Sequence, residues 1–215
     1  LVRLRFRHRV TAFSTSGGVV DGVEGEILES DTAVRGAPTS RTVIGNFHFK
    51  AQAVIVTSGG IGGNHDLVRR NWPERLGPAP THLISGVPDY VDGHMLEVVK
   101  QFGGHLINAD RMWHYPEGIH NYAPIWSHHA IRILSGPSPL WLDARGQRLP
   151  VPLFPGFDTL GALEHITTSG YDYSWFLLNQ RIIEREFALS GSEQNPDLTN
   201  HSLAQTLKSR ILPGA

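Results

Sequence analysis

Residues 53–64 read Ala-Val-Ile-Val-Thr-Ser-Gly-Gly-Ile-Gly-Gly-Asn and contain the pattern on which the predicted fold depends. The apolar run 53–56 is short, largely β-branched and without a 3.6-residue period, which predicts a buried strand. Four glycines follow within five positions, and glycine lets the backbone approach a ligand that a Cβ atom would block. Asn64 is then a predicted N-cap for a helix over residues 65–70. The segment therefore predicts either a phosphate-binding nucleotide site or an ordinary turn.

Composition narrows the class of protein. The chain has 215 residues with 40% apolar content, enough for one large or two small domains. Its 19 basic and 20 acidic residues argue against a general nucleic-acid or membrane-surface role. With no cysteine, disulfides and thiolate chemistry are excluded within the chain. No apolar run reaches about 18 residues and no signal-like segment opens the chain, so we expect no membrane span and a cytoplasmic location.

Several further elements follow from local patterns. Residues 2–29 predict a hairpin that turns at Gly17-Gly18. The alternation of Arg3, Arg5, Arg7 and Arg9 predicts one solvated strand face. The remaining predicted elements are a loop over 30–46, strands over 47–56 and 105–108, a helix over 92–102 with Asp92 as N-cap and Gly103-Gly104 as its stop, a tight hairpin over 140–149, and amphipathic helices over 174–189 and 202–212. Together these elements predict a mixed α and β chain of the α+β class.

The glycine segment resembles a family. Residues 54–64 are similar to the segment that closes the second half of the FAD domain in the fumarate reductase and 3-ketosteroid Δ1-dehydrogenase flavoproteins. Asp92 and Gly93 match two residues of the G-D-G that opens a helix in that family, although plain N-capping also accounts for Asp92. The resemblance implies FAD as the cofactor and a hairpin strand near the adenine. The cofactor-binding residues that we expect are Val10, Thr57, Ser58, Gly59, Gly60, Gly62, Asn64, Asp92 and Gly93.

A second set of residues concerns the substrate. Residues 113–117, Trp-His-Tyr-Pro-Glu, resemble the family's h-P-T segment, whose histidine binds substrate, although Tyr115 intervenes. His114 has the chemistry to donate a hydrogen bond or transfer a proton, or it is a structural histidine. The steroid dehydrogenases of the family use tyrosines to accept the proton, so the candidates here are Tyr115, Tyr122, Tyr171 and Tyr173.

The hairpin around Arg148 separates two branches of the family. Residues 139–148 resemble a family hairpin in which Gly146 and Arg148 match. By register, the proton-donor arginine of fumarate reductases falls near Gly156, and their Thr-Glu pair falls near Ile131-Arg132. An apolar wall of Leu153, Phe154 and Phe157 suits a larger apolar substrate instead. The predicted catalytic residues are His114, Tyr115 and Arg148.

A metal site is not predicted. His114, His120, His128 and His129 fall within 16 residues, yet no H-E-x-x-H pattern accompanies them. The chain also lacks the G-x-G-x-x-G turn that cradles FAD pyrophosphate, and neither end matches a complete domain. We therefore expect a piece of a longer polypeptide, with a partial FAD-binding domain over 1–92, a substrate-binding cap over 93–190 and a C-terminal helix or linker over 191–215.

These observations predict a fragment of an FAD-dependent oxidoreductase that acts on a CH–CH bond of a ketosteroid-like or other bulky apolar small molecule. The fragment by itself is expected to be inactive and to bind FAD weakly or not at all. Two alternatives stay open: an enoate or dicarboxylate reductase of the fumarate reductase type, and a non-enzymatic ligand-binding or assembly domain in which the glycines form a turn. The oligomeric state is left open.

Overall fold

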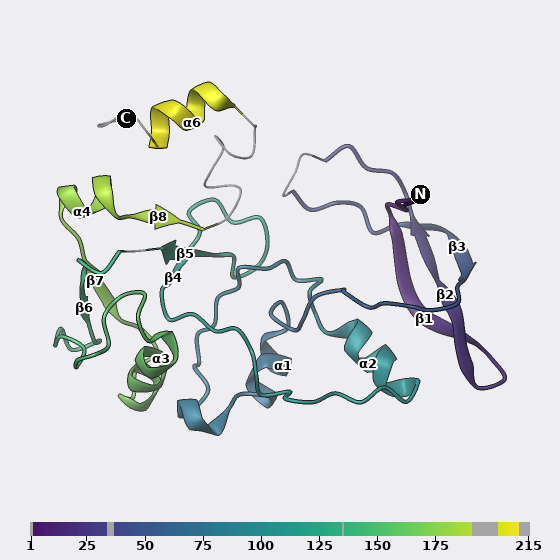
Figure 1. Ribbon diagram of the computed structural model, residues 1–215, viewed down its shortest axis with the longest axis horizontal. Coiled ribbons are helices and arrows are strands. Elements are labelled where there is room, and N and C mark those ends of the chain that lie inside the picture. The colour runs from purple at the N-terminus through teal and green to yellow at the C-terminus, as the bar shows by residue number, and fades with distance from the viewer. Residues whose placement is uncertain (1, 34–36, 135, 191–201, 211–215) are drawn as a thin grey trace. The chain divides into compact units, whose positions relative to one another are not determined.

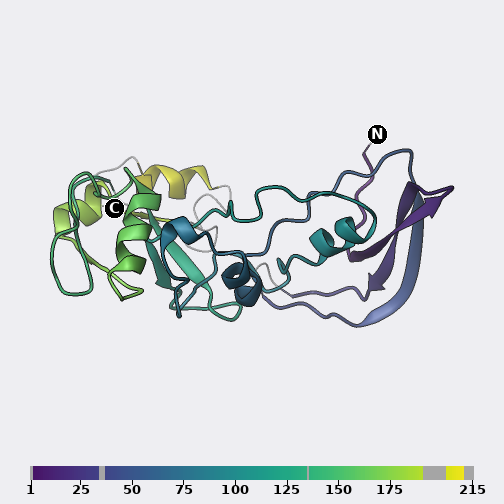
Figure 2. The ribbon, with the colours of Figure 1, turned by 90° about the horizontal axis from the view of Figure 1, so that it is seen from below.

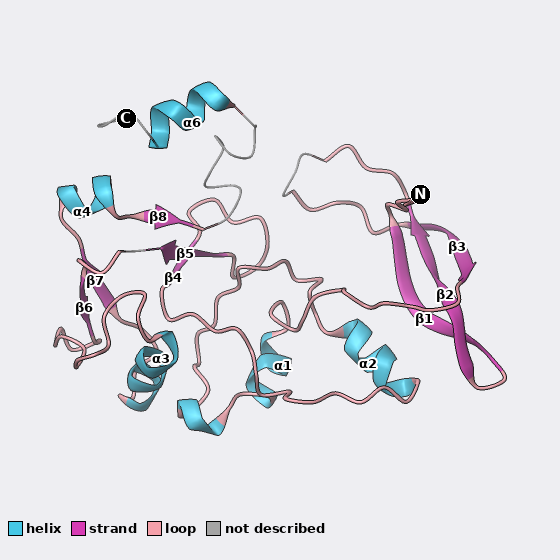
Figure 3. Ribbon diagram, in the orientation of Figure 1, coloured by secondary structure: helices cyan, strands magenta, loops and turns pink. Residues whose placement is uncertain are grey.

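The computed structural model describes residues 2–33, 37–134, 136–190 and 202–210. The chain divides into two compact units, one formed by residues 1–64 with 89–108 and the other by residues 65–88 with 109–215 (Figure 1). Helices and small antiparallel sheets occur together along the chain, which agrees with the predicted α+β class (Figure 3). Within the described residues, no helix has the length and hydropathy of a membrane-spanning segment.

Unit 1 contains a three-stranded antiparallel sheet (Figure 2). Its strands are β1 (His8–Ser16), β2 (Val19–Leu28) and β3 (Val43–Lys50), in that order. Gly17 and Gly18, with φ of 58° and 79°, form the turn between β1 and β2, so the predicted hairpin is confirmed. Glycine is suited to this turn because φ is positive at both positions.

The two faces of this sheet differ in polarity. The register places Phe13 and Phe49 opposite Val23, so these apolar side chains share one face. Helix α2 (His94–Gln101) contacts β1, and Phe102 packs edge-on against Phe13 with ring centroids 5.3 Å apart. The sheet and α2 therefore share one small apolar core.

Arg7 departs from the predicted arginine face. Strand β1 begins only at His8, and Arg7 has φ of 61°, so the alternation of arginines does not continue along a strand. The Arg7 guanidinium donates hydrogen bonds to the carbonyl oxygen of Glu29 at 2.8 Å and to Oγ1 of Thr39 at 3.0 Å. The prediction of one solvated face with four arginines is wrong, because Arg7 instead ties the segment before β1 to the loop after β2.

Two predicted strand segments are absent from the described part of the chain. The strand predicted over 47–56 is confirmed over 47–50 as part of β3, which ends at Lys50, but residues 53–56 form no strand, and Ile55 is 88% exposed. Residues 105–108 likewise form no strand, and Ile107 is 76% exposed. For both segments the prediction is wrong for the same reason: β-propensity becomes a strand only against a neighbour, and no described strand pairs with either segment.

Unit 2 is built of short elements. Its sheets are β4-β5-β8 and β6-β7. A buried cluster of Trp141, Leu149, Ala162 and Ile166, with Leu153 and Phe176 packed against it, forms its core. The elements are α1 (His65–Arg70), the 3₁₀ helix η1 (Glu74–Leu76), β4 (Gly118–His120), β5 (Ala130–Leu134), β6 (Leu140–Leu142), α3 (Thr159–Thr168), β7 (Trp175–Leu177), α4 (Gln180–Arg185), β8 (Ala188–Leu189) and α6 (Leu203–Arg210).

Of the four predicted helices, three are confirmed within the described residues and one is wrong. The helices predicted over 65–70, 92–102 and 202–212 are present as α1, α2 and, within the described residues, α6. The single helix predicted over 174–189 is wrong. Its first part is β7, which pairs with β6, and α4 begins only after Asn179, whose side chain accepts a hydrogen bond from Ile182 N–H at 2.9 Å.

The hairpin predicted over 140–149 is present. Asp143 N–H donates to the carbonyl of Gln147 at 2.8 Å, and Gly146 has φ of 80°. Leu142 and Arg148 then form an antiparallel bridge. Contacts within the structure place residues 65–88 in unit 2 and residues 89–108 in unit 1. The sequence instead predicts a domain boundary between residues 92 and 93. The assignment of a substrate-binding cap stays a prediction.

Candidate functional site

The two predicted cofactor motifs lie side by side in unit 1. Gly63 N–H donates to the carbonyl oxygen of Val91 at 2.8 Å. Asn64 Nδ2 donates to the carbonyl oxygen of Asp92 at 3.4 Å across a sequence separation of 28 residues. The fold thus brings the end of the glycine segment to the start of α2, which the sequence alone did not require.

The backbone before this junction is bare. Residues 57–60 are exposed, and a Cβ atom built on Gly60 would meet no atom within 4 Å. Gly59 has φ of 85°, and a Cβ there would lie 3.1 Å from Cγ1 of Val91. An exposed glycine backbone without covering side chains fits the close approach of a dinucleotide.

The start of α2 differs in one residue from the prediction. The N-cap residue is Gly93, buried and with φ of 84°, and not Asp92. Asp92 is exposed, and its Oδ1 accepts a hydrogen bond from His94 N–H at 2.9 Å, so it still satisfies an amide of the first turn. The left-handed conformation of Gly93 disfavours any residue with a Cβ atom at this position. Val10, the remaining predicted cofactor residue, is half-buried in β1 opposite Gly25.

A charged cluster in unit 2 involves Tyr115. The guanidinium carbon of Arg132 lies 3.5 Å from the centroid of the Tyr115 ring. Arg132 Nε lies 3.8 Å from Oε2 of Glu117, whose side chain is 2% exposed. Both atoms are buried without a hydrogen-bond partner. Burial raises the pKa of Glu117, and the nearby Arg132 cation opposes that rise.

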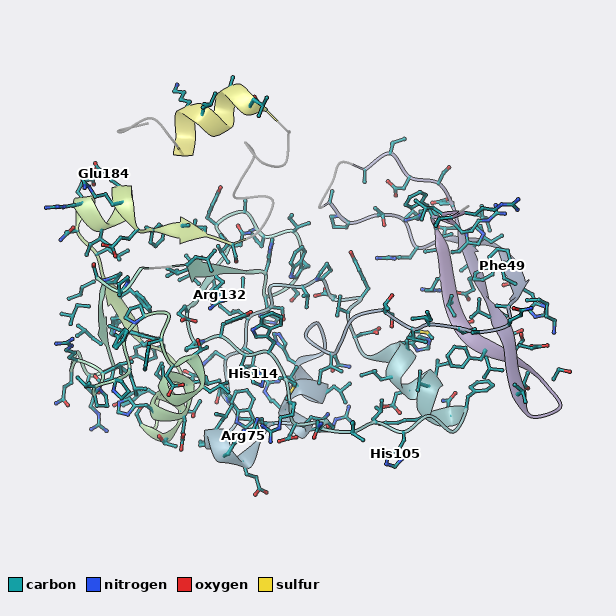
Figure 4. All side chains as sticks on the ribbon, in the orientation of Figure 1. Phe49, Arg75, His105, His114, Arg132 and Glu184 are labelled. Carbon is teal, nitrogen blue, oxygen red and sulfur yellow. The ribbon has the colours of Figure 1, made fainter. Side chains whose placement is uncertain are left out.

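His114 lies in a different environment from its neighbour. Its ring is half-buried against Trp72, with centroids 4.6 Å apart, and its Nε2 is buried without a hydrogen-bond partner. Burial lowers the pKa of His114, and the positive charge of Arg75 lowers that pKa further. Figure 4 labels His114, Arg75 and Arg132. The neutral imidazole is therefore favoured, in which one ring nitrogen is a hydrogen-bond donor and the other is an acceptor.

Arg148 is separate from this cluster. It lines a shallow hollow of about 190 Å³ together with Leu153 and Phe154, and Phe154 stacks on Phe157 with centroids 4.7 Å apart. The predicted apolar wall therefore exists as a local surface. Among the described residues, no hydrogen bond, ion pair or ring contact joins Arg148 to His114 or Tyr115, so the three predicted catalytic residues form no single constellation.

His129 belongs to a buried polar network, whereas His120 and His128 are exposed. His129 stacks on Trp126 with centroids 3.6 Å apart, and Asn121 Nδ2 lies 3.2 Å from its Nδ1. Ser85 contacts His65, with Oγ 2.5 Å from Nε2, and its carbonyl accepts from the Trp126 indole at 3.2 Å. Within the described ranges no three His, Cys, Asp or Glu side chains are grouped to hold a metal ion. This network ties the loop before β5 to the chain around Ser85.

Sequence reasoning missed the roles of Glu117 and Arg132. In the sequence, Arg132 is only the register position of a family carboxylate, and Glu117 is only the last residue of the motif 113–117. A signal for Arg132 does exist, because it is the one charged residue in the apolar strand Ala130–Leu134. Such a charge in a half-buried strand needs a partner, and Glu117 lies just before the strand that pairs with it.

Comparisons with known proteins agree with the resemblance. The model of the family described as FAD binding domain matches residues 1–212. A KsdD-like steroid dehydrogenase of Mycobacterium tuberculosis is 61% identical over 213 residues, which are 99% of this chain and 38% of that protein. A KsdD-like steroid dehydrogenase of Mycolicibacterium smegmatis is 62% identical over 216 residues, covering 100% of this chain and 39% of its own length. No solved structure matches the chain. The chain thus spans less than half of the curated relatives it matches.

Proposed function

Because this chain belongs to the FAD-binding domain family, we propose that it is part of an FAD-dependent dehydrogenase acting on a CH–CH bond of a ketosteroid-like or other bulky apolar substrate. The observation that supports this most is the bare glycine backbone joined by hydrogen bonds to the start of α2. The open space around Gly60, where a Cβ atom would meet nothing within 4 Å, leaves room for a dinucleotide beside the start of α2. This proposal includes a substrate-binding role for residues of unit 2.

The cofactor would be held by main-chain groups of residues 57–62 and by Asn64, with Asp92 and Gly93 forming the adjoining helix start and Val10 in the hairpin. When bound, the flavin supplies hydride transfer at N5. Gly60 and Gly59 permit close approach, and replacing either by a residue with a bulky Cβ would fill the space that the dinucleotide needs.

The proposed roles in unit 2 follow from the environments of the side chains. Tyr115 is the proton acceptor, since its ring is held in place by the Arg132 guanidinium, whose carbon lies 3.5 Å from the ring centroid. His114, with its pKa lowered by burial, is present as a neutral imidazole that orients the substrate through a hydrogen bond. Arg148 and the apolar surface of Leu153 and Phe154 contribute contacts to a bulky ligand.

The test uses the full-length protein that contains this chain, reconstituted with FAD. Turnover of a 3-ketosteroid with an artificial electron acceptor is expected, together with flavin retained after gel filtration. Tyr115→Phe is expected to lower kcat by about a hundredfold with flavin content unchanged, as for loss of an acid–base group. Tyr122→Phe, at an exposed position, is the matched control. Flavin retention without any steroid turnover would overturn the substrate proposal, and absence of flavin would overturn the cofactor site.

One observation favours a second candidate, an enoate or dicarboxylate reductase. The guanidinium of Arg148 forms no ion pair within the described residues, so it is available to an acidic ligand. Arg148→Ala in the full-length protein distinguishes the two. A large loss of rate on fumarate, with steroid turnover absent, would favour the reductase, whereas retained steroid turnover favours the dehydrogenase.

A further inference from the structure

We propose that the terminal nitrogens of Arg132 bind an oxygen of the substrate, a carbonyl or carboxylate oxygen, and that Glu117 is a positioning residue for this guanidinium, which packs against the ring of Tyr115. The inference rests on the proposed function and names the substrate group that unit 2 recognises. It concerns a residue that no motif singled out as catalytic.

The main chain of Arg132 is fixed on both sides of β5. Its N–H donates to Ser190 Oγ at 3.0 Å, and its carbonyl accepts from Ser190 N–H at 2.9 Å. On the other side it pairs with Gly118 of β4. Ile133 N–H donates to the carbonyl of Glu117 at 2.9 Å, which holds the acidic residue beside the same strand. The base of the Arg132 side chain therefore starts from a rigid position.

The side chain is held on two more sides. Tyr115 covers one face of the guanidinium at 3.5 Å, and Glu117 Oε2 lies 3.8 Å from Nε. That separation is too long for a hydrogen bond, so Glu117 supplies charge and shape but no direct N–H···O bond. A buried pair without hydrogen bonds is a poor source of stability, because desolvation of the two ions is not repaid. A structural role alone leaves this arrangement unexplained.

The end of the side chain is open. Nε is buried, yet the Arg132 side chain as a whole is 28% exposed, so its accessible surface includes atoms other than Nε. Neither terminal nitrogen has a hydrogen-bond partner within the described residues. Unlike Nε, neither of them is buried. Other arginines use these nitrogens inside the fold: Arg69 donates to the carbonyl of Thr81 at 2.8 Å, and Arg75 pairs with Asp110. Arg132 instead keeps its terminal donors available.

A guanidinium fixed in this way suits oxygen recognition. Its terminal N–H groups form a planar fork that pairs with carboxylate oxygens or donates to a carbonyl oxygen. Because Tyr115 and the backbone of β5 already restrict its rotation, little side-chain freedom is lost when an oxygen binds. An ionised Glu117 offsets the charge of Arg132, so the guanidinium then binds a neutral carbonyl oxygen in preference. A protonated Glu117 leaves the Arg132 charge uncompensated, so the guanidinium then binds a carboxylate in preference.

The test is ligand binding to the FAD-loaded full-length protein, followed by perturbation of the flavin absorbance. The probes are a 3-ketosteroid, its 3-deoxy analogue and a steroid carboxylate that lacks the ketone. Arg132→Gln is expected to raise the Kd of the 3-ketosteroid or of the carboxylate by about tenfold or more and to leave the 3-deoxy analogue within about twofold, as for loss of charge-assisted hydrogen bonds. Arg145→Gln, at an exposed position, is the control. The probe that responds identifies the carbonyl or the carboxylate as the recognised group.

Two further variants keep the proposal falsifiable. Arg132→Lys retains the charge without the planar fork, so an intermediate loss of affinity for the responding probe is expected. This variant replaces Arg132→Gln in the test if Arg132→Gln does not retain flavin. Glu117→Gln is expected to tighten binding of the carboxylate relative to the ketone. Equal weakening of all three probes by Arg132→Gln and Arg132→Lys would overturn the inference while leaving the proposed dehydrogenase intact. A wild-type protein that lacks steroid turnover would instead overturn the function on which the inference rests.

Discussion

The glycine segment of unit 1 and the Arg132 cluster of unit 2 are built on opposite principles. Residues 57–60 are exposed, and Gly59 and Gly60 present main chain without side chains. The Tyr115, Glu117 and Arg132 cluster offers charged and aromatic side chains whose base is sealed from solvent. The first arrangement suits a ligand recognised through backbone groups, and the second suits recognition of one oxygen atom.

This difference also separates two uses of glycine. A Cβ atom on Gly25 would lie 2.0 Å from the carbonyl oxygen of Arg9, so strands β1 and β2 approach each other only because Gly25 has no side chain. A Cβ atom on Gly60 would meet nothing within 4 Å. Gly25 therefore serves packing, whereas Gly60 has no packing contact that a side chain would disturb, as the proposed approach of a ligand requires.

The largest effect is expected from Gly25→Ala. The added methyl overlaps the Arg9 carbonyl and forces β1 and β2 apart, at an expected cost of about 3 kcal/mol or more in the free energy of unfolding of unit 1. Amide hydrogen exchange of β1 and β2 measures this loss. Gly18→Ala, in the turn, has open space for its methyl and is expected to cost less, from its positive φ alone. Unchanged exchange in Gly25→Ala would contradict the packing role.

Gly60→Val is the converse test. Stability is expected to change by less than about 0.5 kcal/mol because the position is exposed and unpacked. Affinity of the full-length protein for FAD is expected to fall about a hundredfold, which is about 2.7 kcal/mol. Titration of the apoprotein with FAD, followed by flavin fluorescence, gives the constant. An unaltered affinity would show that the bare turn does not contact the cofactor.

Glu117→Ala probes the sealed cluster. The variant leaves Arg132 Nε buried beside no anion, so a loss of about 2 kcal/mol in stability of unit 2 is expected, less than for a fully buried pair because Arg132 is partly exposed. All five tryptophans lie in unit 2, so urea unfolding followed by tryptophan fluorescence reports on it directly. Glu117→Gln, which preserves volume, is expected to cost less. Equal stability of the alanine variant and the wild type would mean that the pair has no energetic role.

The smallest effect concerns pH and His114. Burial lowers the pKa of His114 in the folded state below its ordinary value of 6.5, so the unfolded chain binds more protons as the pH falls. Stability of unit 2 is therefore fully present above about pH 6.5 and declines as the pH drops through the lowered pKa. His114→Gln is expected to flatten this decline in urea midpoints measured across that window, whereas His120→Gln, at an exposed position, is not. A slope that survives in His114→Gln would assign the decline to other groups.

Local elements were predictable where local chemistry defines them. The Gly17-Gly18 hairpin, the Gly103-Gly104 stop after α2 and the turn at Gly146 all depend on residues within a few positions of each other. The helix predicted over 174–189 failed because β6 pairs with Trp175–Leu177, a contact more than 30 residues away. Partner-dependent structure overrides the local pattern in such cases.

The sequence by itself determined the mixed α and β class, the glycine segment and the family resemblance, since composition, turn chemistry and motif spacing are written along the chain. Only the tertiary structure decided that residues 63–64 hydrogen-bond to residues 91–92, and that Glu117 and Tyr115 close around Arg132. The physical reason is that contacts between segments far apart in the chain set which groups meet and which are shielded from water. In unit 1 these are the hydrogen bonds from residues 63–64 to 91–92, and in unit 2 the pairing of β4 with β5. Burial and charge at Arg132 are therefore properties of the fold and not of any motif.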